Sequence, residues 1–152
     1  MKILSSIFSI IILCFNIYCS QTKNNEKQII QMLSNFYTAY NKAWSSNLDS
    51  ESLIKELKVL QEKNCTEKLR NKLNTLFKNH GLDHDIMIND IYTDMQLIKT
   101  MSINKDPKTE NGYVVTYNAK TEDPYNKEKI VEVNIHITVL KENDHYLIDS
   151  VQ

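Results

Sequence analysis

Glycine and proline are scarce in this chain, whose 152 residues include only two of each. A phosphate-cradling loop or a dinucleotide fingerprint needs several glycines close together, so the sequence excludes both. It also contains no G-x-S-x-G nucleophile elbow, no H-E-x-x-H zinc motif and no C-x-x-C pair. The enzyme classes that depend on these motifs are therefore excluded.

An excess of charge of either sign is also absent, because 18 Lys and Arg residues stand against 19 Asp and Glu residues. Phosphate binding needs a concentrated basic face and none is visible, so we expect no nucleic-acid partner. The content of 41% hydrophobic and 24% charged residues is typical of a folded globular protein. We expect a monomer or dimer that binds no cofactor and no metal.

The first twenty residues differ in composition from the rest of the chain. Lys2 precedes an apolar run from Ile7 to Tyr18, and charged residues resume at Lys23. This pattern is typical of an export signal, and the run is shorter than the roughly 20 apolar residues of a spanning helix. The sequence therefore predicts an export signal in residues 1–20 and a single domain in residues 21–152, located in the periplasm or anchored by a lipid to the bacterial envelope.

Cys19 leaves two alternatives open for the end of the signal. It stands where a bacterial lipoprotein carries its lipid, although Tyr18 departs from the small residue usual before that cysteine. The alternative is ordinary cleavage after Ser20. A lipid on Cys19 is the only membrane contact that we expect. With Cys19 lipidated or removed, Cys65 has no partner for a disulfide, and we predict that it is buried and inert.

Helical periodicity dominates the first half of the predicted domain. Apolar residues recur at helical spacing over residues 25–44, 50–61 and 66–80, and Gly81 ends the third stretch. The first of these helices carries an aromatic stripe. An aromatic stripe at helical spacing predicts packing in a core in preference to a ligand cavity: Phe36, Tyr37, Tyr40 and Trp44.

In the second half, apolar residues alternate with polar ones, as in half-buried strands. The alternation predicts four strands in hairpin succession, within residues 95–103, 113–119, 129–140 and 145–151. Helices followed by hairpin strands predict an α+β fold in which three N-terminal helices pack on a four-stranded antiparallel sheet.

The stretch NHGLDHDIMINDIYTD, residues 79–94, joins the two halves and contains four aspartates and two histidines without a lysine or arginine. His80 and His84 have the spacing of a helical metal pair, but Gly81 interrupts it. Asp83 and Asp85 begin like a calcium loop whose further oxygen ligands are missing. We therefore predict a polar connection in which Asp83 caps a helical turn and four apolar side chains enter the core: Ile86, Met87, Ile88 and Ile91.

Two classes of function are compatible with these features. One is a non-enzymatic binding protein for a protein partner or small ligand, for example an immunity-like protein that docks on a toxin in the periplasm. The other is a small-molecule enzyme that uses Asp90 or Asp94 as general base, with Tyr117 or His136 as hydrogen-bond partner. We favour binding, because the predicted sheet face offers valine and isoleucine but no convergent polar groups.

Four segments together resemble a known family: FYTAYNKAW (36–44), CTEKL (65–69), DHDIMIND (83–90) and HYLIDSV (145–151). They resemble a family of uncharacterised envelope proteins of Gram-negative bacteria, catalogued as a domain of unknown function. That family is similar to the nuclear transport factor 2-like, or cystatin-like, superfamily. The resemblance implies a curved sheet that wraps a long N-terminal helix into a cone. The acidic motif departs from the family pattern, because His84 fills an aromatic place and Ile86 a proline place.

Overall fold

A computed structural model describes residues 24–122 and 127–152, so the predicted export signal and Cys19 lie outside the described residues. The N-terminal helix (residues 24–44) is followed by α2 (Ser50–Asn64) and α3 (Glu67–His80). Two short 3-10 helices come next, η1 (Ile86–Ile88) and η2 (Leu97–Thr100). Strands β1 (Ser102–Lys105), β2 (Gly112–Glu122), β3 (Glu128–Glu142) and β4 (His145–Val151) complete the fold.

The boundaries of α2 and α3 follow from local hydrogen bonding. The Asp49 side chain caps α2 by accepting a hydrogen bond from the backbone N–H of Ser52. The Thr66 hydroxyl caps α3 by accepting one from the backbone N–H of Leu69. At the other end of α3, Gly81 adopts a φ of 63°, which glycine enters without a steric penalty. The predicted end of the third helix is confirmed.

The four strands form one antiparallel sheet in the order β1-β2-β3-β4. The long β2–β3 pair runs from Gly112 opposite Thr138 to Glu122 opposite Glu128, whereas β4 pairs only with the C-terminal part of β3. Three helices followed by this sheet confirm the predicted α+β fold. The sheet is curled but not closed.

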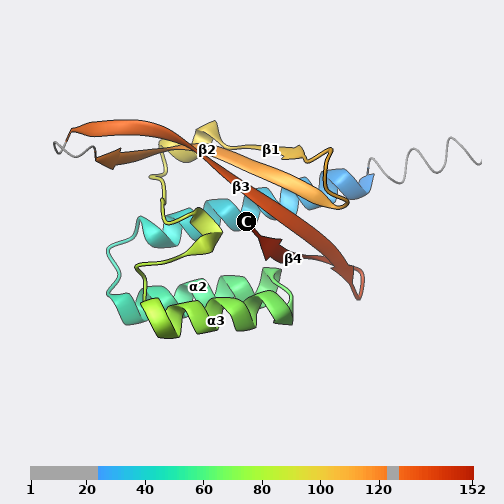
Figure 1. The fold of residues 1–152 in the computed structure, drawn as a ribbon, viewed down its shortest axis with the longest axis horizontal. Helices are drawn as coiled ribbons and strands as arrows, with labels where there is room; N and C mark the ends of the chain where they lie inside the picture. Colours follow the sequence, from blue (N-terminus) through green and yellow to red (C-terminus); the bar gives the residue numbers. More distant parts are fainter. Residues whose placement is uncertain (1–23, 123–126) are drawn as a thin grey trace, which may run out of the picture.

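The hydrophobic core lies between the sheet and the helices. Figure 1 shows the N-terminal helix between the sheet above it and the α2–α3 pair below it. This central position explains why its aromatic stripe is largely buried, with Phe36, Tyr37 and Tyr40 inaccessible and Trp44 half-buried. Alternate residues of β3 belong to the same hydrophobic core as these aromatic rings: Val133, Ile135, Ile137 and Val139.

The prediction of a strand from residue 95 is wrong for its first seven residues. The Asp94 side chain accepts hydrogen bonds from the backbone N–H groups of Gln96 and Leu97 (2.8 and 2.9 Å). These bonds start the turn that continues into η2, and β1 begins only at Ser102. An aspartate that caps a turn therefore prevails over the alternating apolar pattern.

None of the helices within residues 24–122 and 127–152 combines the length and the hydrophobicity of a membrane-spanning segment.

Candidate functional site

The centre of the connection between α3 and the sheet is the carboxylate of Asp85, which is 1% exposed. Its Oδ2 accepts hydrogen bonds from the Tyr40 hydroxyl (2.8 Å) and from Trp44 Nε1 (3.1 Å). Its Oδ1 accepts from the backbone N–H of Met87 (2.9 Å), which caps η1. Asp85 therefore performs the capping role predicted for Asp83, and that prediction is wrong, because Asp83 is exposed while Asp85 also meets two donors of the N-terminal helix.

Burial and hydrogen bonding shift the pKa of the Asp85 carboxyl in opposite directions. Loss of solvent raises the pKa of this carboxyl above its usual value, and the hydrogen bonds from Tyr40, Met87 and Trp44 oppose that shift. The Tyr40 hydroxyl is itself held by Gln61 of α2, whose amide donates to it at 2.9 Å. The network thus joins the N-terminal helix, α2 and η1 through one buried carboxylate.

Two further tyrosines lie in the same interior. The Tyr37 hydroxyl is buried and has no hydrogen-bond partner among the described residues. Desolvation raises the pKa of Tyr37, with smaller contributions from Tyr117, Cys65 and Asp85. The Tyr117 hydroxyl donates to the backbone carbonyl of Ile91 at 2.9 Å. These large side chains fill the space between the N-terminal helix and β2.

The segment 90–94 is fastened to both the N-terminal helix and β2. The backbone N–H of Thr93 donates to the side chain of Asn41 (2.8 Å), and the Thr93 hydroxyl donates to the carbonyl of Asn118 (2.7 Å). Asp90 accepts from the backbone N–H of Asp85 and lies 2.9 Å from His84 Nδ1. This segment is therefore a fixed part of the surface beside the sheet.

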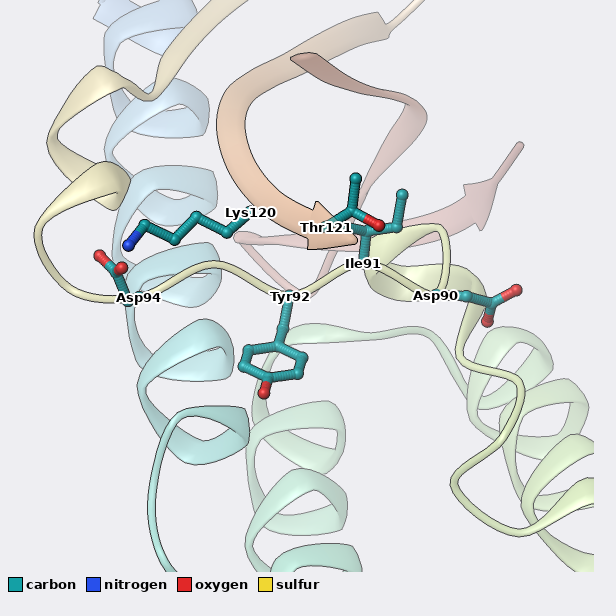
Figure 2. Close-up of a pocket in the computed structure, with 6 residues that line it drawn as sticks. All are labelled: Asp90, Ile91, Tyr92, Asp94, Lys120 and Thr121. Atoms are coloured by element: carbon teal, nitrogen blue, oxygen red, sulfur yellow. The ribbon is translucent and has the colours of Figure 1, made fainter. Parts of the chain in front are cut away.

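A recess of about 310 Å³ opens between this segment and the end of β2. Its lining comes from the segment and from two β2 residues: Asp90, Ile91, Tyr92, Asp94, Lys120 and Thr121. Figure 2 shows the Tyr92 ring projecting from the segment between Asp94 on one side and Asp90 on the other, with Lys120 extending toward Asp94.

Tyr92 is 47% exposed, and its ring stacks on Trp44 with ring centroids 5.8 Å apart and an interplanar angle of 15°. Because Trp44 also donates to Asp85, the buried carboxylate orients the half-buried indole on which the exposed Tyr92 ring stacks. Tyrosine and tryptophan rings held in one position are the side chains that most often anchor a protein interface.

The side chains of the two aspartates beside Tyr92 are accessible to solvent, and each also has hydrogen-bond partners within the chain. Hydrogen bonds from the amides of Leu97 and Gln96 lower the pKa of Asp94, and Lys120 adds to this shift. Lys120 also forms an ion pair with Glu128 across the β2–β3 hairpin, with 2.9 Å between Nζ and Oε1. The ammonium group in the recess therefore already has an acidic neighbour outside it.

The four residues of the alternative enzymatic hypothesis do not form one constellation. Asp94 caps the turn into η2, Asp90 holds the backbone of Asp85, and the Tyr117 hydroxyl donates to a carbonyl. His136 lies on the outer face of β3, where its Nδ1 is 3.6 Å from Asp106. Each group thus has another partner, and His136 occupies the surface position that the strand alternation indicates.

The remaining residues that the sequence singles out are His80, His84 and Cys65. The rings of His80 and His84 pack edge to face with their centroids 5.9 Å apart, and His84 contacts Asp90. In the part of the chain that the structure describes, no group of three or more His, Cys, Asp or Glu side chains is placed to hold a metal ion. Cys65 is buried and unpaired there, and burial raises the pKa of its thiol to about 12, in agreement with the predicted inert cysteine.

Sequence reasoning did not identify Tyr92 or Lys120 as site residues. A signal for Tyr92 was present, because one aromatic residue stands between Asp90 and Asp94 in a polar connection. Its stacking on Trp44 had no signal, since these two residues meet only in the folded chain.

No protein-family model matches this chain, and no curated protein matches it. The fold is similar to the crystal structure of a protein of unknown function from Bacteroides thetaiotaomicron VPI-5482, with a TM-score of 0.71 and 24% sequence identity. The similarity covers 91% of this chain and 98% of that chain. It shows that the two proteins share a fold.

Proposed function

We propose that this chain is an exported, non-enzymatic binding protein of the bacterial envelope, and that a protein partner docks at the recess around Tyr92. The export signal predicted in residues 1–20 supports the location. The order of helices and strands and the curled sheet support membership of the nuclear transport factor 2-like, or cystatin-like, superfamily. An immunity-like protein that docks on a periplasmic toxin is one concrete form of this function.

The observation that carries the proposal is the contrast between the interior and the surface. Inside, both oxygens of Asp85 already accept hydrogen bonds, and a substrate would have to displace Tyr40, Trp44 or Met87 to reach them. Outside, the Tyr92 ring is exposed, oriented by Trp44 and set in a recess. Preorganised aromatic side chains favour binding, because little conformational entropy remains to be lost.

The alternative is a small-molecule enzyme or ligand-binding protein that uses the interior. One observation favours it, namely the buried Asp85 carboxyl, whose raised pKa suits a general base. Native mass spectrometry of protein isolated from its own envelope separates the alternatives, since an interior ligand gives a stoichiometric added mass.

The test of the proposed function is affinity capture from the native envelope with three forms of the mature protein. We expect the wild type and Val59→Ala to retain the same partner, and Tyr92→Ala to lose most of it. Val59 is a suitable control, because it is 58% exposed on α2 and is not among the residues that line the recess. A stoichiometric metabolite without a protein partner, or equal capture by all three forms, contradicts the proposal.

A further inference from the structure

The recess around Tyr92 has a charge pattern that restricts its partner. Asp90 and Asp94 lie on either side of Tyr92, and the one cation among the described lining residues is Lys120, which extends toward Asp94 and also pairs with Glu128. The face of an aromatic ring attracts a cation, and a carboxylate on each side adds to that attraction. A positively charged group over Tyr92 thus meets the ring and two carboxylates, of which Asp94 also faces Lys120.

The backbone of β2 contributes a second element. The N–H and C=O of Asn118 point away from β3, since they bond to the Thr100 hydroxyl and to the Thr93 hydroxyl. Backbone groups of alternate residues in a strand point the same way, so those of Lys120 also point away from β3, toward the recess. Strand β1 pairs with β2 only as far as Thr116, so among the described residues no strand pairs with this side of β2 at Lys120, and a strand edge of this kind binds extended peptide.

We propose that the occupant of this recess is an extended, positively charged segment of the protein partner, which places an arginine or lysine side chain over Tyr92 between Asp90 and Asp94. The inference rests on the proposed function and assigns the chemistry of the partner. The main chain of that segment lies along Lys120. Exposed charges are screened by salt, so the interaction weakens as ionic strength rises.

The test uses the isotope-labelled mature protein and two synthetic peptides. One has the sequence Gly-Ser-Arg-Thr-Arg-Ser-Gly, and in the other both arginines are replaced by citrulline, an uncharged near-isostere. We expect the arginine peptide to shift the amide resonances of Tyr92, Lys120 and Thr121 at low salt. The citrulline peptide should bind more weakly by a factor of about ten or more, because it lacks the charge that the ring and the carboxylates attract.

Variants of the protein identify the groups responsible. The double variant Asp90→Asn, Asp94→Asn keeps the side-chain oxygens that accept from backbone amides but removes both charges, and we expect it to weaken binding of the arginine peptide by about tenfold. Its matched control is Glu56→Gln with Glu62→Gln, two exposed charges on α2, which should bind like the wild type. Thermal unfolding of each variant confirms that it is folded.

The outcomes separate this inference from the proposed function. Equal binding of the two peptides, shifts confined to another surface, or no shift with the arginine peptide overturns the inference. If Tyr92→Ala nevertheless loses the envelope partner, docking at the recess stands and only the assigned charge is wrong. If the peptide result overturns the inference and Tyr92→Ala captures the partner as well as the wild type does, the proposed docking at the recess is wrong too.

Discussion

The Tyr40 hydroxyl donates a 2.8 Å hydrogen bond to Asp85 Oδ2, although 45 positions separate the two residues in sequence. This bond fixes the connection after α3 against the N-terminal helix. Trp44 donates to the same oxygen, and the exposed Tyr92 stacks on Trp44. A buried carboxylate thereby orients a half-buried tryptophan and the exposed tyrosine that stacks on it, so the stability of the fold and the shape of the recess depend on the same residue.

Replacement of Asp85 by alanine should destabilise the fold far more than the same change at Asp83. The Asp85→Ala change leaves buried donors of Tyr40, Trp44 and Met87 without their acceptor, and one such loss costs about 1–3 kcal/mol. Asp83→Ala changes an exposed side chain and should stay within about 0.5 kcal/mol of the wild type. Urea unfolding measures the free energy of unfolding of both variants. An equal loss of stability in the two variants would contradict the assignment of Asp85 as the structural centre.

The stability contributed by Asp85 should depend on pH in the direction opposite to that of a capping aspartate. Its pKa is raised in the folded state, so the folded protein binds this proton more tightly than the unfolded chain does. The stabilisation that the protonated Asp85 carboxyl adds to the folded state is complete below 3.8, its pKa in the unfolded chain. This stabilisation is lost as pH rises through the higher pKa that the carboxyl has in the folded state.

The non-titrating variant Asp85→Asn isolates this effect. The free energy of unfolding of the wild type relative to Asp85→Asn should fall as pH rises from about 4 to about 7. Fluorescence of Trp44, the only tryptophan in the chain, monitors unfolding at each pH. A relative stability that increases over this range would show that the hydrogen bonds outweigh desolvation.

Two isoleucines of the connection should differ in their contribution to the core. Ile88 is 1% exposed in η1, and truncation to alanine should cost about 2–5 kcal/mol through lost burial and a cavity. Ile91 is only half-buried and lines the recess, so Ile91→Ala should cost less. Chemical denaturation of the two variants side by side checks the order, and the reverse order would be inconsistent with this packing.

Cys65 should be unreactive in the native protein. It lies buried where α2 ends, and burial raises the pKa of its thiol to about 12, so the thiolate is scarce at neutral pH. A thiol reagent such as dithionitrobenzoate should label it only after denaturant is added. Rapid stoichiometric labelling of the folded protein would mean that this region opens readily.

The parts of the fold that sequence predicts well are those with local causes. The helical spacing of the first half and the alternation from Val131 to Val139 depend on neighbours a few residues away, and both appear in the structure. The acidic connection has no such local signal, because Asp83, Asp85 and Asp90 are alike in sequence. Only the donors of Tyr40 and Trp44, more than 40 positions upstream, distinguish Asp85 as the buried one.

The measurement that tests the proposed docking most directly is amide hydrogen exchange of the mature protein, free and in complex with its captured envelope partner. The account predicts slower exchange on binding at residues 90–94 and at Lys120 and Thr121, with α2 and α3 unchanged. Protection confined to α2 and α3, with exchange around Tyr92 unaltered, would contradict the assignment of this recess as the docking site.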